Sequence, residues 1–470
     1  MTRLTARAYR GERPQPGESA IRPLPVRLSA LDIWAFILPA VSFAQVAVVG
    51  QLFVSELLML VMLPWLWSVR DRPPLPRWFV VLWAGWLLSQ VVTDIVVGSA
   101  FEDFARGWAA IMFTLTDFAA ILVLAATPRR ARLFALGLAT GGILGYFIAP
   151  SIFAAAYPWK FAFGLPVAFV LAAILSGSIG NRLSLLSAGV FLFFGGLNLL
   201  LGFRNLGGIS LLTAGYLLLS AFAGRRQAVL EWSIRRTTAG LLLLAIGVVG
   251  TLQLYDVAAS QGLLGSGAQA EYESQSGALG VLIGGRQEIL ASSQAVIDSP
   301  ILGHGSWAKD PKYIDVLAQQ LNDLGYVATT DLYGSDLIPT HSFVMGSWVW
   351  AGFLGAVFWL GVLGVAVWLL ANVYMFRLEL APLVVFFAMF LLWNIAFSPY
   401  GSGARMLACY GLVLCLLGLR QMRRYGADHP ALRPAIWASR PPRRASWGWG
   451  GGPAAGRDGR PASDRTGGDA

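Results

Sequence analysis

Long apolar runs separated by short polar connections dominate the pattern of this chain. Each run holds roughly 18 to 25 residues, the length that an α-helix needs to cross a bilayer. The runs lie at about 31–50, 51–69, 78–97, 104–126, 131–149, 159–176, 183–202, 205–223, 237–257, 343–372, 378–397 and 404–420. The short alternating segments of a transmembrane β-barrel are missing from the sequence. The pattern therefore predicts an all-α polytopic membrane protein with about twelve transmembrane helices.

A long polar stretch, 258–341, separates the ninth run from the tenth. It is too long for an ordinary connection between helices, and loops of this length are usually functional. One helix is predicted from Arg286 to Ser299, ended by Pro300. A second, amphipathic helix is predicted from four apolar residues at helical spacing, lying on the membrane face or over a cavity. These four residues are Ile314, Leu317, Leu321 and Leu324.

This pattern divides the chain into five parts. They are a disordered basic tail (1–28), nine transmembrane helices (29–257), the large outer loop (258–341), three transmembrane helices (342–424) and a second disordered tail (425–470).

Composition and charge agree with a membrane protein. The chain has 56% hydrophobic and 13% charged residues, whereas soluble domains have roughly 25% charged residues. Its formal charge is +10, which could suggest nucleic-acid binding. The arginines, however, gather in the two tails and in the connections after even-numbered runs, as the positive-inside rule describes. We therefore expect no nucleic-acid partner and place both tails in the cytoplasm.

The same alternation places the 258–341 loop on the outer side of the membrane. Between 258 and 340 there are nine acidic residues against three basic ones, a net charge of −6. The two cysteines, Cys409 and Cys415, both lie in the last apolar run and cannot cross-link this loop.

Three arginines on the outer side do not follow the charge rule and are the first candidates for chemistry. Arg204 lies in a tight turn between two runs, Arg286 opens the predicted loop helix, and Arg405 begins the last run. A guanidinium close to hydrocarbon is costly and marks either a site or a paired structural charge. Its planar fork suits phosphate oxygens, which favours a diphosphate-bearing lipid as ligand.

A structural role for these arginines remains the alternative. Each could extend to lipid headgroups, or pair with an acid in an apolar run. The candidate acids are Glu56, Asp94 and Asp117.

His341 is the candidate general base. It follows Pro339-Thr340 at the start of the tenth run, which predicts a place in the first turn of a helix. The helix dipole there disfavours imidazolium and helps keep the ring able to accept a proton. The alternative is a capping or interfacial histidine. His304, between two glycines, is predicted to be a turn residue.

Metal and nucleotide chemistry have little support in the sequence. Paired histidines, CxxC and DxD motifs and a P-loop are missing. The acidic pair Glu102-Asp103 in an outer connection is the nearest feature to a metal site. We therefore expect neither a metal nor a cofactor.

Three local motifs follow one another late in the chain. They are Gly285-Arg286 before a predicted helix, the run Asp298-Ser299-Pro300-Ile301-Leu302-Gly303-His304-Gly305, and His341-Ser342-Phe343 leading into Trp350-Ala351-Gly352-Phe353-Leu354-Gly355. With about a dozen spans and a late outer loop, this order resembles the O-antigen ligase and polymerase superfamily, most specifically over about 275–360. The family often has asparagine where Ser342 stands.

The resemblance implies an activity and roles for residues. It implies a metal-independent glycosyltransferase of the bacterial inner membrane with its active loop in the periplasm. The donor is a glycan on a polyprenyl diphosphate, and the acceptor is lipid A core for a ligase or a lipid-linked glycan for a polymerase. Arg286 and Arg204 become the clamp on the diphosphate, and His341 becomes the base. Arg405 stays a candidate for substrate binding from its position alone.

Two other classes remain open. A transporter or flippase of lipid-linked sugars would also need many spans and buried arginines, but it should show repeated halves with interrupted helices. A metal-dependent membrane glycosyltransferase would use Glu102 and Asp103.

The predicted topology can be tested with cysteines introduced at Ser274 and Asp323. Both positions fall in the 258–341 loop, so both should react with a membrane-impermeant thiol reagent when only the outer membrane has been permeabilised. Labelling that appears only after the inner membrane is lysed would contradict the topology.

Overall fold

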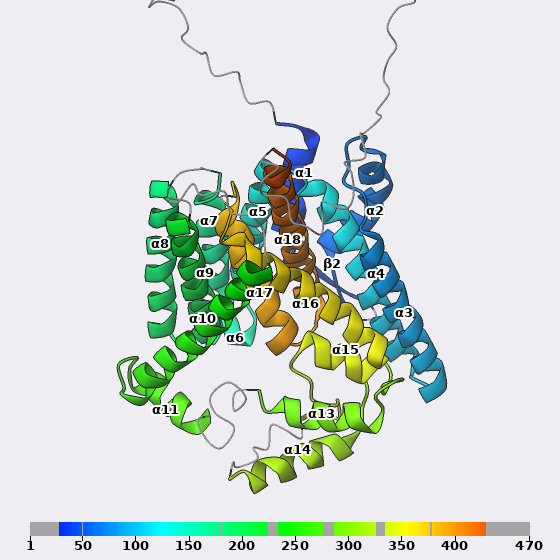
Figure 1. Ribbon diagram of the computed structural model, residues 1–470. Coiled ribbons are helices and arrows are strands. Elements are labelled where there is room, and N and C mark those ends of the chain that lie inside the picture. The colour runs from blue at the N-terminus through cyan, green and yellow to red at the C-terminus, as the bar shows by residue number, and fades with distance from the viewer. Residues whose placement is uncertain are drawn as a thin grey trace, which may run out of the picture.

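The computed structural model describes residues 28–48, 50–177, 181–223, 234–275, 286–325, 334–376 and 378–428. Over these residues the chain forms a helical bundle with a layer of loop helices across one end (Figure 1). The two tails that the sequence predicts to be disordered lie almost entirely outside the described residues.

A helix occupies each of the twelve predicted runs, which supports an all-α membrane protein. Among the described residues, seven helices are long and apolar enough to cross a bilayer. They are α3 (Arg77–Val97), α4 (Phe101–Leu124), α5 (Pro128–Ile148), α9 (Arg204–Ala223), α10 (Ile234–Ser260), α16 (Phe353–Val373) and α18 (Ser402–Asp428). Shorter apolar helices are α1 (Ala30–Ala40), α2 (Val54–Ser68), α7 (Gly164–Ile174) with the π-helix η1 (Trp159–Phe163) before it, α8 (Asn181–Leu200) and α17 (Ala381–Phe397). The small α6 (Ile152–Ala156) precedes η1.

The first predicted run, 31–50, is not one continuous helix. Helix α1 ends at Ala40, one residue after Pro39, and the chain then forms an antiparallel hairpin of β1 (Gln45–Val48) and β2 (Gly50–Phe53). Proline removes a backbone donor from a helix, and β-branched valines favour extended backbone. Hydropathy alone could not distinguish this arrangement from a single span.

The tenth run is also divided, at Gly352. Helix α15 (Phe343–Ala351) ends there, and α16 begins at the next residue. Gly352 has φ +68° and ψ −160°, a region that is essentially open only to glycine. A Cβ atom on it would lie 1.9 Å from the carbonyl oxygen of Ile301. The break thus lets the loop segment at Ile301 approach the helix backbone.

The segment 301–305 of the outer loop fills this break. The amide of His304 donates to the carbonyl of Val349 at 2.6 Å, and the amide of Phe353 donates to that of Ile301 at 3.2 Å. His304 lies in the predicted turn, and its ring nitrogen is 2.8 Å from the carbonyl oxygen of Ala295. We call the pairing of 301–305 with the α15–α16 break the loop clasp.

Both predicted loop helices are present, as α13 (Glu288–Asp298) and α14 (Pro311–Asp323), and α11 (Ser266–Gln275) lies at the same end of the bundle (Figure 1). The apolar face of α14 packs against α13, where Leu317 and Leu321 are buried with Ala291 and Ala295. The prediction gave the membrane face or a cavity as the surface beneath this helix; in the structure its apolar face lies on α13.

The loop clasp predicts that Gly352→Ala destabilises the protein. The added methyl group meets the backbone of Ile301, and alanine does not tolerate this backbone region, so we expect a loss of about 2 kcal/mol or more in unfolding free energy. Thermal unfolding in detergent measures it. Gly364→Ala in α16 is the matched control, because a Cβ atom there meets nothing within 4 Å. Equal stability of the two variants would contradict the clasp.

Candidate functional site

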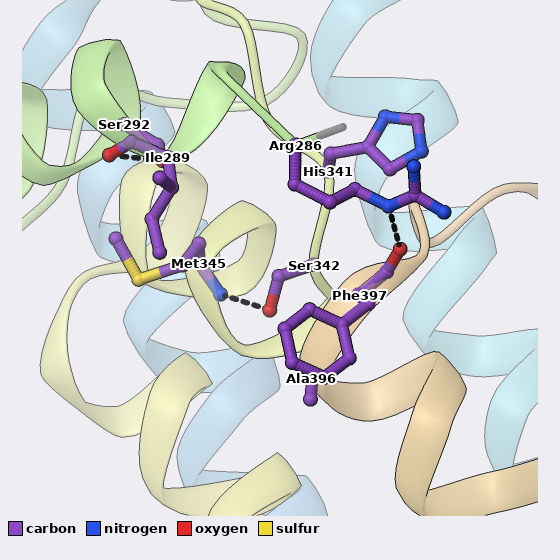
Figure 2. A pocket seen from close by; sticks show the side chains of 8 residues that line it. All are labelled: Arg286, Ile289, Ser292, His341, Ser342, Met345, Ala396 and Phe397. Carbon is purple, nitrogen blue, oxygen red and sulfur yellow. Dashed lines mark hydrogen bonds between the residues drawn. The ribbon is translucent and has the colours of Figure 1, made fainter. Parts of the chain in front are cut away.

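The structure brings Arg286 and His341 to one small cavity beneath α13 (Figure 2). Arg286 immediately precedes Gln287, the N-cap of α13, and its Nε donates to the carbonyl of Phe397 at the end of α17 at 2.9 Å. His341 immediately precedes the N-cap of α15. The cavity has a volume of about 30 Å³ and is lined by Arg286, Ile289, Ser292, His341, Ser342, Met345, Ala396 and Phe397.

Positive charge concentrates at this site. Burial lowers the pKa of Arg286, the charge of nearby Arg204 lowers it further, and Glu288 opposes both effects. Arg204 therefore lies close enough to interact with Arg286, and its guanidinium carbon is 5.3 Å from the ring centroid of Tyr255. A partly buried guanidinium with a second guanidinium in electrostatic range favours the binding of an anion.

Glu288 is a site residue that the sequence analysis missed. Its Oε1 lies 3.3 Å from Nδ1 of His341. Burial raises the pKa of Glu288, but the hydrogen bond from His341 and the charges of His341 and Arg286 outweigh it, and the pKa falls below 4.5. The sequence feature that could have identified Glu288 is its position two residues after Arg286, in the first turn of a predicted helix.

The ionised Glu288 stabilises the folded loop over a defined pH range. Because its folded pKa lies below the ordinary value of 4.5, the contribution is fully present above that pH. It is lost as the pH falls through the lowered pKa.

The sequence had predicted His341 in the first turn of a helix, and this prediction is wrong because His341 lies before the helix. Ser342 is the N-cap of α15, its Oγ accepts from the amide of Met345 at 3.3 Å, and the helix begins at Phe343. The imidazole extends away from the helix end towards Glu288. When Nδ1–H donates to this carboxylate, Nε2 keeps its lone pair and can accept a proton. The ring therefore lies outside the helical turn whose dipole was predicted to disfavour imidazolium, and a carboxylate orients it.

Arg405 lies at a different place from the other two arginines. Its Nε and one NH2 group donate to the two carboxylate oxygens of Glu56 at 2.6 and 2.8 Å, and the Arg405 side chain is only 6% exposed. Asp117 interacts electrostatically with this pair and is fully buried. The guanidinium of Arg405 already binds a carboxylate. This supports the alternative to substrate binding, in which Arg405 forms a structural ion pair.

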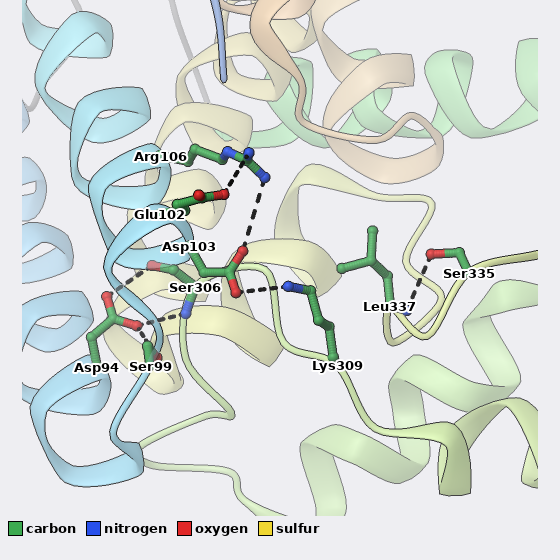
Figure 3. A network of polar contacts seen from close by, with 9 residues as sticks. All are labelled: Asp94, Ser99, Glu102, Asp103, Arg106, Ser306, Lys309, Ser335 and Leu337. Atoms are coloured by element: carbon green, nitrogen blue, oxygen red, sulfur yellow. Dashed lines mark hydrogen bonds and ion pairs between the residues drawn. The ribbon is translucent and has the colours of Figure 1, made fainter. Parts of the chain in front are cut away.

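The acidic pair Glu102-Asp103 is engaged by basic residues (Figure 3). Asp103 accepts from Lys309 of the loop at 2.8 Å, and Arg106 lies 3.4 Å from Glu102 and 4.0 Å from Asp103. A divalent metal would have to displace both cations. Over the parts of the chain that the structure describes, no group of three or more His, Cys, Asp or Glu residues could hold a metal ion.

Asp94, near the end of α3, fastens the loop beside this pair (Figure 3). Its carboxylate accepts from the amide and hydroxyl of Ser306 at 2.6 and 2.8 Å. It also accepts from Ser99 at 2.7 Å, Trp108 at 2.8 Å and Gln90 at 3.3 Å. These donors satisfy a carboxylate that is only 3% exposed, so its burial is compatible with a stable fold. The sequence suggested Asp94 only as a possible partner for an arginine.

Comparisons of the chain with models of protein families, with curated proteins and with solved structures found no match.

The pairing of Arg405 predicts a loss of stability when its charge is removed. Arg405→Met leaves Glu56 buried without its cation, and breaking such a pair costs about 3–5 kcal/mol. Thermal unfolding in detergent should show a large fall for the single variant and a smaller one for Arg405→Met with Glu56→Gln. A single variant with normal stability and lost activity would return Arg405 to substrate binding.

Proposed function

We propose that this protein is a membrane glycosyltransferase of the O-antigen ligase or polymerase type. It transfers a glycan from a polyprenyl-diphosphate carrier to a sugar hydroxyl of lipid A core or of a growing polysaccharide, without a metal. The observation that carries the proposal is the meeting of Arg286 with His341, which pairs with Glu288, at a cavity beneath a loop helix, with Arg204 acting electrostatically on Arg286.

The proposal includes a location and a topology. The protein crosses the bacterial inner membrane about twelve times, with both ends in the cytoplasm and the 258–341 loop in the periplasm. Figure 1 supports this arrangement, because the start of α1 and the end of α18 lie at the end of the bundle opposite α13 and α14.

The chemistry requires a cation for the leaving group and a base for the acceptor. As the glycosidic bond to phosphate breaks, negative charge develops on the diphosphate, and Arg286 and Arg204 stabilise it. As the acceptor oxygen bonds to the anomeric carbon, its proton passes to Nε2 of His341. Glu288 holds the ring in the required tautomer and balances the positive charge that forms on it.

The size of the cavity fits the hydroxyl group of the acceptor. A volume of about 30 Å³ admits a group of the size of a water molecule. A hydroxyl group can therefore enter between Arg286 and His341, whereas the sugars and the diphosphate lie outside the cavity.

His341→Ala is the test of this proposal. Loss of a general base costs about 10²–10⁴ in rate, and we expect this loss in glycan transfer by the purified protein in lipid with EDTA present. Glu288→Gln should lose less, because it keeps an acceptor for Nδ1–H but removes the charge.

His304→Ala is the control, since His304 belongs to the loop clasp and lies outside the cavity lining. It should keep most of the activity of the wild type. Near-normal turnover by His341→Ala, or loss of wild-type activity in EDTA, would reject the proposed mechanism in favour of a metal-dependent one.

A further inference from the structure

A second, larger cavity lies on the bundle, and the transferase proposal does not use it. It has a volume of about 300 Å³, the lower end of the range for small-molecule sites. Its walls come from β2, α5, η1, α7 and α18, and most are apolar, including Phe53, Leu138, Phe169 and Met406. Such a lining suits a hydrocarbon chain.

One cation lies in this apolar lining. Lys160 of η1 is the only charged residue among the described residues that line the cavity. Its side chain is partly buried. Within the described part of the chain, Nζ of Lys160 lies 5.5 Å from the centroid of the Phe161 ring. An ammonium group that is partly removed from water at an apolar cavity can pair with an anion there.

The surroundings of Lys160 expose large apolar and aromatic side chains. Ile152, Phe153, Tyr157 and Phe161 are 87%, 66%, 63% and 51% exposed. Exposed aromatic residues with a lysine are typical of the boundary between hydrocarbon and headgroups. Figure 1 shows α6, just before η1, at the end of the bundle where the loop helices lie.

We propose that this cavity binds an anionic membrane lipid. The phosphate of the headgroup pairs with the Lys160 ammonium, and part of one chain enters the apolar cavity. The proposal does not depend on the transferase activity, because its evidence is the lining, the volume and the charge of a separate cavity.

Lipid binding can be measured directly. The probe is phosphatidylglycerol, with zwitterionic phosphatidylcholine for comparison, added to the purified full-length protein in detergent and followed by native mass spectrometry. A charge-assisted contact adds about 1.5–3 kcal/mol, so we expect at least about tenfold tighter binding of phosphatidylglycerol. Lys160→Gln should abolish this preference, and Lys312→Gln, an exposed lysine of the outer loop, should retain it.

The cavity itself is tested by filling it. A Cβ atom on Gly403 finds only Phe53, at 4.0 Å, so Gly403→Leu adds apolar volume to the lining without a backbone clash. It should weaken both lipids at least severalfold while thermal unfolding stays near that of the wild type.

Three results would overturn the proposal. Unchanged lipid binding by Gly403→Leu would show that Lys160 meets headgroups only at the surface. Displacement of phosphatidylglycerol by millimolar inorganic phosphate would show a site for free phosphate. An equal affinity of the wild type for both lipids would show that the charge of Lys160 does not contribute to lipid binding.

Discussion

The buried carboxylate of Asp94 joins two parts of the chain that differ in character. Helix α3 belongs to the apolar bundle, and Ser306 belongs to a polar loop with many ways to be solvated. A carboxylate that is 3% exposed must keep its donors, because losing them would leave a buried charge without compensation. The loop therefore stays on the bundle, and Lys309 reinforces the attachment through Asp103. The same loop carries Arg286, Glu288 and His341.

The candidate arginines differ in their partners. Glu56 accepts from Nε and one NH2 group of Arg405, which makes a buried bidentate ion pair inside the bundle. Arg286 donates to a backbone carbonyl, and it interacts with both the carboxylate of Glu288 and the like charge of Arg204. Arg405 therefore supports the fold, whereas Arg286 lines the cavity of the candidate site.

The sequence predicted the helices, because these follow from the periodicity of apolar residues. It missed the features that depend on contacts between distant parts of the chain. Apolar runs located a helix in every expected place, and the spacing of Leu317 and Leu321 located α14. The division at Gly352 and the hairpin after Ala40 escaped, because neither changes the hydropathy of its run. Glu288 and Asp94 escaped as well, since their roles come from partners distant in sequence. Arg286 and His341 were found from residue type and position, but only the folded chain brings them to one cavity.

Helix α15 works as a spacer of fixed length and fixed rotation. Its nine residues span about 14 Å, with about 100° of rotation for each residue. The loop clasp holds one end through Val349 and Gly352, and His341 directly precedes the other. A single inserted or deleted residue within α15 would therefore turn the imidazole away from Glu288 while every contact of the clasp stayed intact.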